Sequence, residues 1–145
     1  MSVALIDDHL LGQVLLGEAP KALASKQRFT TGCWYLRLCQ AVLAVSGSEG
    51  SLSRPFIELP PSLRERALHG PVHLPDNIGS ISLRDLAPAI ARLCQRHRLN
   101  MLSVEALAAA SQLDADVHLS VHSPPLGKAL KLERLRVRVP RTTKR

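Results

Sequence analysis

The chain has 145 residues, a length that suits one domain with a hydrophobic core of its own. Aromatic side chains make up only 3% of it while Leu and Ala are frequent, which favours helix-rich packing over a β-sandwich. No apolar run reaches about 18 residues and no basic segment precedes the first apolar stretch, so we expect neither a transmembrane helix nor a signal peptide. Three cysteines without paired spacing are typical of a reduced, cytoplasmic protein with no membrane partner.

The net charge of +7 is concentrated at the C-terminal end. Residues 128–145 contain eight Lys or Arg side chains and one acid, whereas the charges of the remaining residues balance. Such a basic end can attract RNA or DNA phosphates or an acidic partner, although a merely solubilising tail has the same composition. The candidate nucleic-acid-binding residues are Lys128, Lys131, Arg136, Arg138 and Arg141. A second basic group, Arg92, Arg96, His97 and Arg98, falls at a predicted helix end, where cations complement the helix dipole and could also contact a polyanion.

Four apolar residues at positions 3–6 lead directly into Asp7 and Asp8, and a helical apolar pattern begins at Leu10. The unbroken apolar run predicts a buried, central strand of a parallel sheet, and Asp8 is placed to cap the helix that follows. Ligands of open α/β sheets bind at the carboxyl ends of the strands, where these two acids fall. The alternative interpretation is that Asp8 is only a helix cap and Asp7 only a solvated loop acid.

Strands and helices alternate along the rest of the chain. Strands are predicted at 28–31 and 116–120, an edge strand at 135–139, and short extended or loop segments at 72–75 and 100–102. Helices are predicted from residue 10 and over 35–45, 62–69, 83–94, 104–113 and 126–132, with Ser82 and Ser103 as caps. This alternation predicts one α/β domain over residues 1–140, with a mainly parallel central sheet flanked by helices, and a basic tail over 141–145.

The motifs of common catalytic sites are missing from the sequence: it has no Gly-rich phosphate loop, no CxxC or HExxH metal motif and no GxSxG elbow. What remains is an acidic constellation, because Asp7 and Asp8 follow the first strand and Glu105 opens a late helix. If these elements are neighbours, three carboxylates converge at one end of the sheet. Oxygen ligands of this kind bind Mg²⁺ or Mn²⁺, and such ions assist phosphodiester cleavage.

Four stretches occur in an order that resembles PIN-domain proteins: Asp7-Asp8-His9-Leu10 after a strand, Thr30-Thr31 ending a strand, and residues 103–110 and 117–120. The resemblance covers most of the chain. Known members are metal-dependent ribonucleases, including many toxins of bacterial toxin–antitoxin pairs. It implies a PIN-like α/β fold, catalytic roles for Asp7 and Glu105, and Mg²⁺ or Mn²⁺ held by Asp7, Asp8 and Glu105, with His122 as a further candidate ligand for Mn²⁺. An antitoxin-like partner protein and a homodimer belong to the same expectation.

Two positions depart from the family pattern. Arg37 stands where the family has a Glu, and Ser120-Val121-His122 stands where an acid follows the late strand. Because a guanidinium repels a divalent cation, we expect a nucleic-acid-associated protein of nuclease ancestry with a degenerate metal site and little or no RNA cleavage. The alternatives are an active Mg²⁺- or Mn²⁺-dependent ribonuclease, and a non-catalytic interaction module in which Arg37 bridges to Asp7 or Glu105. All three place Asp7 and Glu105 within side-chain reach of each other.

Overall fold

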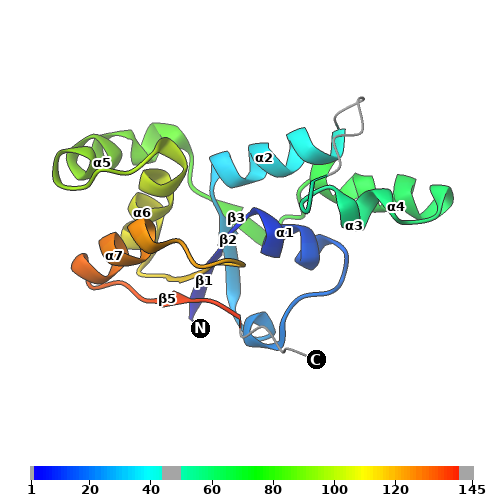
Figure 1. Ribbon diagram of the computed structural model, residues 1–145, viewed down its shortest axis with the longest axis horizontal. Helices are drawn as coiled ribbons and strands as arrows, with labels where there is room; N and C mark the ends of the chain where they lie inside the picture. The colour runs from blue at the N-terminus through cyan, green and yellow to red at the C-terminus, as the bar shows by residue number, and fades with distance from the viewer. Residues whose placement is uncertain (1, 44–49, 141–145) are drawn as a thin grey trace.

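A five-stranded, all-parallel sheet forms the centre of the computed structural model, which describes residues 2–43 and 50–140 (Figure 1). The strand order is β3-β2-β1-β4-β5, so β1 lies in the middle of the sheet. The strands are β1 (Val3–Ile6), β2 (Gln27–Thr30), β3 (Ile78–Ser80), β4 (Asp116–His118) and β5 (Val137–Arg138). The predicted α/β fold with a parallel sheet is therefore confirmed, as is the central position of β1.

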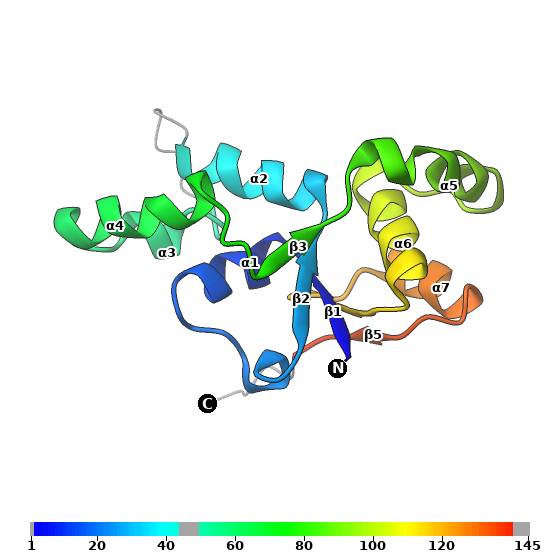
Figure 2. The same ribbon diagram turned by 180° about the vertical axis from the view of Figure 1, so that it is seen from behind.

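Helices cover both faces of this sheet. Figures 1 and 2 show α5, α6 and α7 gathered on one side of the strands and α1 to α4 on the other. The helices are α1 (Asp8–Leu15), the 3₁₀ helix η1 (Lys21–Leu23), α2 (Gly32–Leu43), α3 (Arg54–Ile57), α4 (Pro61–Val72), α5 (Leu83–Arg96), α6 (Met101–Leu113) and α7 (Pro124–Leu132). No helix in this described part of the chain is long and apolar enough to cross a membrane.

The apolar sequence of β1 is explained by burial on both faces. Leu5 packs into a core formed with α5, α6 and α7, whereas Ala4 and Ile6 pack into a second core formed with α1 and α2. All three side chains are fully buried. Such a strand has no solvent face, so its sequence does not alternate between apolar and polar residues. The strand ends at Ile6, so Asp7 lies directly beyond it at the carboxyl edge of the sheet.

Several predicted boundaries are wrong. Met101 and Leu102 are not a strand or loop but the first residues of α6. Asn100 caps this helix by accepting the Ser103 N–H at 2.9 Å, and Ser103, the predicted cap, lies inside the helix. The extended segment expected from residue 72 begins later, because α4 continues to Val72. Strand β3 was not predicted at all. The expected helix end at residues 44–45 and the basic tail with Arg141 lie outside the described residues.

Candidate functional site

The carboxyl edge of the sheet brings Asp7 and Ser120 together. Asp7 follows β1 and caps α1, because its Oδ1 accepts the Leu10 N–H at 3.0 Å. Its Oδ2 accepts two further hydrogen bonds from Ser120, one from the backbone N–H and one from the hydroxyl, both at 2.7 Å. Asp7 therefore ties β1, α1 and the segment after β4 together. The expectation that Asp8 caps this helix is wrong, since Asp7 occupies that position.

Burial dominates the electrostatics of Asp7, which is 6% exposed. It raises the pKa of the Asp7 carboxyl, while the hydrogen bonds from Leu10 and Ser120 oppose the rise and the charge of Asp8 adds to it. Both carboxyl oxygens are already bound by donors of the protein itself. A metal ion at this carboxylate would have to compete with those hydrogen bonds.

Asp8 lies in the first turn of α1 and has different partners. Its Oδ1 accepts the backbone N–H of His9 at 2.8 Å and is 3.0 Å from His9 Nδ1. Its Oδ2 is buried, has no hydrogen-bond partner among the described residues, and lies 3.5 Å from Arg37 Nε. Arg37 therefore does turn toward the acids, but its partner is Asp8 and not Asp7 or Glu105, the partners that the interaction-module alternative gave it.

Glu105 anchors the start of another helix. It lies in the second turn of α6, not the first, and is 2% exposed. Its Oε1 accepts the Cys33 N–H at 2.9 Å, and a side chain at Gly32 would meet Oε2 at 3.3 Å. Burial, followed by the hydrogen bond and charge of Glu105, raises the pKa of the Cys33 thiol to about 11. Glu105 thus satisfies one of the free N–H groups at the beginning of α2.

The predicted metal ligands do not assemble into one site. In the described ranges, no three His, Cys, Asp or Glu side chains group together as ligands of a single ion. A cavity of about 180 Å³ at the sheet edge is lined by Asp7, Asp8, His9 and Arg37, but Glu105 and His122 do not line it. The side chains present therefore do not fit the Mg²⁺ or Mn²⁺ site that the resemblance implies.

The predicted nucleic-acid-binding residues fall in two places. Arg138 of β5 and Arg136, which directly precedes that strand, both donate from Nε to Asp116 of β4, and the Arg138 bond is 2.9 Å long. Burial acts to raise the pKa of Asp116, but the hydrogen bonds from Arg138 and Arg136 outweigh it and hold the pKa below its usual value. Each guanidinium stays more than half exposed, so an additional anion can still approach these arginines.

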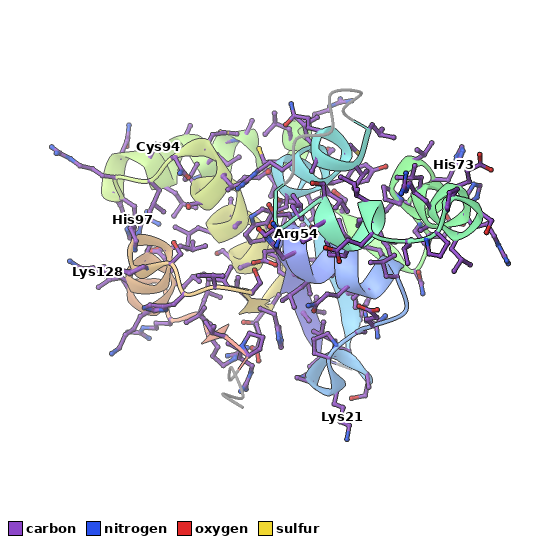
Figure 3. The ribbon with its side chains drawn as sticks, turned by 45° about the vertical axis from the view of Figure 1, so that its right-hand side comes forward. Lys21, Arg54, His73, Cys94, His97 and Lys128 are labelled. Carbon is purple, nitrogen blue, oxygen red and sulfur yellow. The ribbon has the colours of Figure 1, made fainter. Side chains whose placement is uncertain are left out.

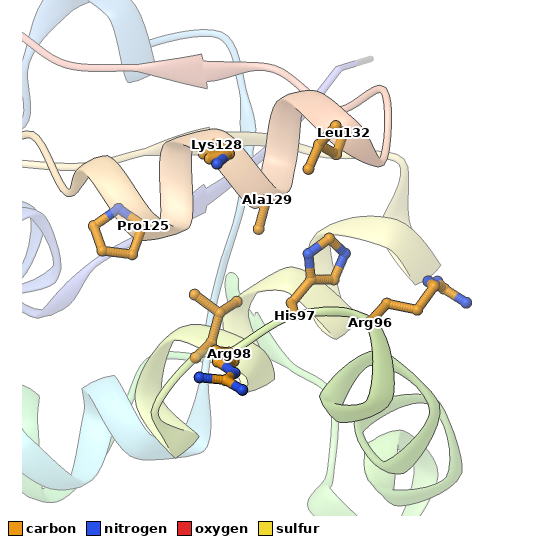
Figure 4. Close-up of a pocket in the computed structure, with 8 residues that line it drawn as sticks. Arg96, His97, Arg98, Pro125, Lys128, Ala129 and Leu132 are labelled. Carbon is orange, nitrogen blue, oxygen red and sulfur yellow. The ribbon is translucent and has the colours of Figure 1, made fainter.

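Lys128 belongs to a separate basic cavity of about 300 Å³ between α7 and the connection from α5 to α6. Figure 4 shows Lys128 and Pro125 of α7 on one side of it and His97 and Arg98 on the other. Arg96 and His97 are paired with Glu133, at 2.8 and 3.2 Å.

Two cations of this cavity form no ion pair within the described part of the chain, namely Arg98 and Lys128. Lys131 is exposed on the same helix as Lys128. The cluster at 96–98, interpreted from sequence mainly as a helix-dipole effect, thus shares a cavity with one of the predicted nucleic-acid-binding residues.

Sequence reasoning missed a hydrogen-bond chain that starts from two residues of the acidic cavity, Asp8 and His9. His9 Nε2 lies 3.0 Å from the hydroxyl of Ser51, while its Nδ1 faces Asp8. Ser51 comes from the Gly- and Ser-rich stretch between α2 and α3, far from His9 in sequence. The only sign of this hydrogen-bond chain in the sequence is that Asp8 and His9 are adjacent. The sequence around Ser51 does not indicate that it lies next to His9.

Comparison of the chain with models of known protein families gives no match, and a search of curated proteins gives none either. The fold and the side-chain geometry are therefore the basis for any functional assignment.

Proposed function

We propose that this protein binds nucleic acid without cleaving it, as a PIN-like domain of nuclease ancestry whose metal site is degenerate. The observation that carries the proposal is the arrangement around Asp7, where both carboxyl oxygens accept hydrogen bonds from Leu10 and Ser120. Metal-assisted phosphodiester cleavage needs carboxylates that are free to hold divalent ions close together. A carboxylate already bound by three donors is poorly suited to that task.

Arg37 strengthens the argument against cleavage. Its guanidinium lies beside Asp8 at the same sheet edge, so its positive charge opposes a divalent ion there. Glu105, the third acid of the expected set, is buried against the start of α2 and bound to the Cys33 N–H. Each of the three acids thus has a structural partner in place of a metal.

Binding is supported by the basic surface. Arg98 and Lys128, which form no ion pair with any residue that the structure describes, lie beside the apolar side chains of Leu99 and Leu132. Cations of this kind bind phosphates, and the adjoining apolar surface can contact a ribose or base. Figure 3 shows Lys128 and His97 on one side of the molecule and Lys21 at a distant end, so the two regions can be tested separately.

The cleavage half is tested by incubating the purified protein with labelled RNA in Mg²⁺ or Mn²⁺, next to Asp7→Asn. We expect no metal-dependent cleavage from either protein. Robust cleavage by the wild type that disappears in Asp7→Asn would instead identify an active ribonuclease of the toxin type.

The binding half is tested by fluorescence anisotropy with single-stranded RNA, with DNA as a second probe. The Arg98→Ala/Lys128→Ala double variant should bind several-fold more weakly at low salt. A matched control, Lys21→Ala/Arg66→Ala, removes two exposed cations elsewhere and should bind like the wild type. Equal loss in both variants would mean that binding follows total charge and not this cavity.

A non-catalytic protein-interaction module is the second candidate. It is favoured by the Arg37–Asp8 ion pair and by Val121, which is 72% exposed at the rim of the acidic cavity. Its partner would be an antitoxin-like protein or a second copy of this chain. Failure to bind RNA or DNA even at low salt would favour this candidate. A cytoplasmic location is part of either proposal, since Cys33, Cys39 and Cys94 are all free thiols.

A further inference from the structure

Asp8, His9 and Ser51 form a continuous hydrogen-bond chain that the nucleic-acid proposal leaves unused. Asp8 Oδ1 lies 3.0 Å from His9 Nδ1, and His9 Nε2 lies 3.0 Å from Ser51 Oγ. The acid is buried, the imidazole is partly exposed and the serine is exposed. This is the order of roles in a nucleophilic triad: a buried acid orients a base, and the base contacts an accessible hydroxyl.

The contacts of Asp8 fix the roles of the two imidazole nitrogens. Asp8 Oδ1 also accepts the backbone N–H of His9 at 2.8 Å, so this oxygen is an acceptor on the side that faces the ring. In the neutral imidazole, the tautomer with its hydrogen on Nδ1 donates that hydrogen to this oxygen. Nε2 is left with a free lone pair, which can accept the hydroxyl hydrogen of Ser51.

The neighbouring cavity, which His9 lines and Ser51 does not, is the space where the acyl part of a substrate would lie. It is about 180 Å³ in volume, His9 and Arg37 line it, and its apolar walls include Trp34, Leu102 and Leu126. A small apolar acyl group fits a cavity of this size and lining. Arg37 lines the same cavity, its side chain is 53% exposed and its Nε lies 3.5 Å from Asp8 Oδ2, so a carbonyl oxygen that develops negative charge inside the cavity would meet a cation.

We propose that Ser51, His9 and Asp8 form a hydrolytic site for esters of small apolar acids, an activity separate from nucleic-acid binding. Ser51 Oγ attacks the carbonyl carbon and its proton passes to His9 Nε2. The leaving alcohol takes that proton as the ester bond breaks, which leaves an acyl group on Ser51. Water then attacks the acyl carbon, gives its proton through His9 to Ser51 Oγ, and releases the acid. Ser51 and His9 are the catalytic residues, and Asp8 is a positioning residue.

The first test uses a fluorophosphonate probe on the full chain, with the labelled residue identified by peptide mass mapping. The hydroxyl oxygen of Ser51 should displace fluoride from the probe's phosphorus. His9→Gln keeps a hydrogen-bonding group near Ser51 but cannot take its proton, so labelling should slow by about a hundredfold. Ser51→Ala should abolish it, whereas Ser111→Ala, which removes an exposed serine on α6, should label like the wild type. Hydrolysis of p-nitrophenyl acetate should follow the same order.

Absence of labelling at Ser51, or equal labelling in His9→Gln, would overturn the proposal. Thermal melting of each variant shows whether it is folded. A second measurement on the wild type does not depend on any variant: ¹⁵N chemical shifts of His9 should place the ring hydrogen on Nδ1. A hydrogen on Nε2 would mean that His9 donates to Ser51 and cannot act as its base, which would also overturn the proposal. In Asp8→Asn the preference for Nδ1 should weaken and labelling should slow, whereas a purely structural Asp8 would leave the His9 tautomer unchanged.

Discussion

Two adjacent acids follow β1, and their side chains have different partners. Asp7 binds three donors from two segments, the start of α1 and Ser120 shortly after β4, and so connects parts of the chain that are far apart in sequence. Asp8 faces Arg37 and His9 at the edge of the cavity. At the scale of single residues, Asp7 therefore matters mainly for stability, and Asp8 mainly for the orientation of His9.

Asp7→Ala should lower the free energy of unfolding by about 2–3 kcal/mol, because it removes a helix cap and leaves donors of Ser120 without their acceptor. Asp8→Ala is the matched control at the neighbouring position and should cost about 1 kcal/mol or less, since Arg37 can turn to solvent. Urea denaturation measures both values. A larger cost for Asp8→Ala would mean that the cap has been assigned to the wrong acid.

The pH dependence of stability should have opposite signs at Asp116 and Asp7. The two arginines lower the pKa of Asp116, so its stabilising contribution is complete above the usual value of 3.8 and is lost as the pH falls through the lowered pKa. Burial raises the pKa of Asp7, so its protonated form favours the folded state, and this contribution is lost as the pH rises through the raised pKa.

Urea denaturation of the wild type, Asp116→Asn and Asp7→Asn between about pH 7 and pH 3 separates these effects. The advantage of the wild type over Asp116→Asn should shrink toward low pH. Its stability relative to Asp7→Asn should rise over the same range. Parallel curves for all three proteins would show that neither carboxyl has a shifted pKa.

At the scale of elements, the start of α2 depends on residues outside that helix. The Cys33 N–H is bound by Glu105 of α6, and the Trp34 N–H by the Thr31 hydroxyl at 3.1 Å. These bonds satisfy donors that a helix cannot satisfy within itself. Because α2 also carries Arg37, Glu105 helps to set where this cation lies relative to Asp8.

Glu105→Ala should destabilise the protein by about 2 kcal/mol and increase hydrogen exchange at Cys33, because it leaves the partly buried Cys33 N–H without its acceptor and opens a small cavity where the buried Glu105 side chain was. Glu105→Gln keeps an acceptor oxygen of the same size and should cost clearly less. Amide exchange followed by NMR distinguishes the two. Identical exchange at Cys33 in both variants would exclude the anchoring role.

The fold was predictable from sequence where one element shows its own pattern. The apolar run of β1 and the alanine-rich α6 were identified because their burial is nearly complete, which leaves an unbroken apolar signature. Strand β3 was missed because it is three residues long and contains Gly79, whose missing side chain leaves room for the ring of Phe29. The reason for a glycine at this position is the Phe29 side chain of the neighbouring strand β2. The local sequence around Gly79 cannot show which strand lies beside it.

The candidate site was predictable only in part, for the same reason. The position of Asp7 at the sheet edge follows from the order of β1 and α1. That Ser120 would bind Asp7, and that Glu105 would bind the Cys33 N–H, depends on contacts across more than 70 residues of chain. The residue types alone indicated an acidic cluster. Packing determined that Asp7 and Glu105 accept hydrogen bonds from other parts of the chain.

At the scale of the whole molecule, the charge is unevenly distributed. Basic residues of α7 and of the connection from α5 to α6 share one cavity, while Arg136 and Arg138 are partly neutralised by Asp116. Phosphate binding should therefore depend more on Lys128 and Arg98 than on Arg136 and Arg138.

Nucleic-acid affinity should fall linearly with salt on a double-logarithmic plot, with a slope of about 0.7 per phosphate contact for single strands. Deletion of residues 141–145 removes three cations and should reduce that slope without unfolding the domain. Anisotropy titrations at several salt concentrations measure the slope, and thermal melting checks the fold. An unchanged slope would mean that the tail makes no phosphate contact.

The central place of β1 also has a consequence for the folding rate. Strand β1 pairs with β4, with Ala4 opposite Asp116. Forming this pair therefore closes a loop of roughly 110 residues. A high contact order slows folding, because the chain loses conformational entropy in closing the loop before the strands gain the energy of pairing. During that delay the most apolar strand has an open edge, available to any other chain with the same edge exposed. Refolding from urea should consequently be slow, and its yield should drop as the protein concentration rises.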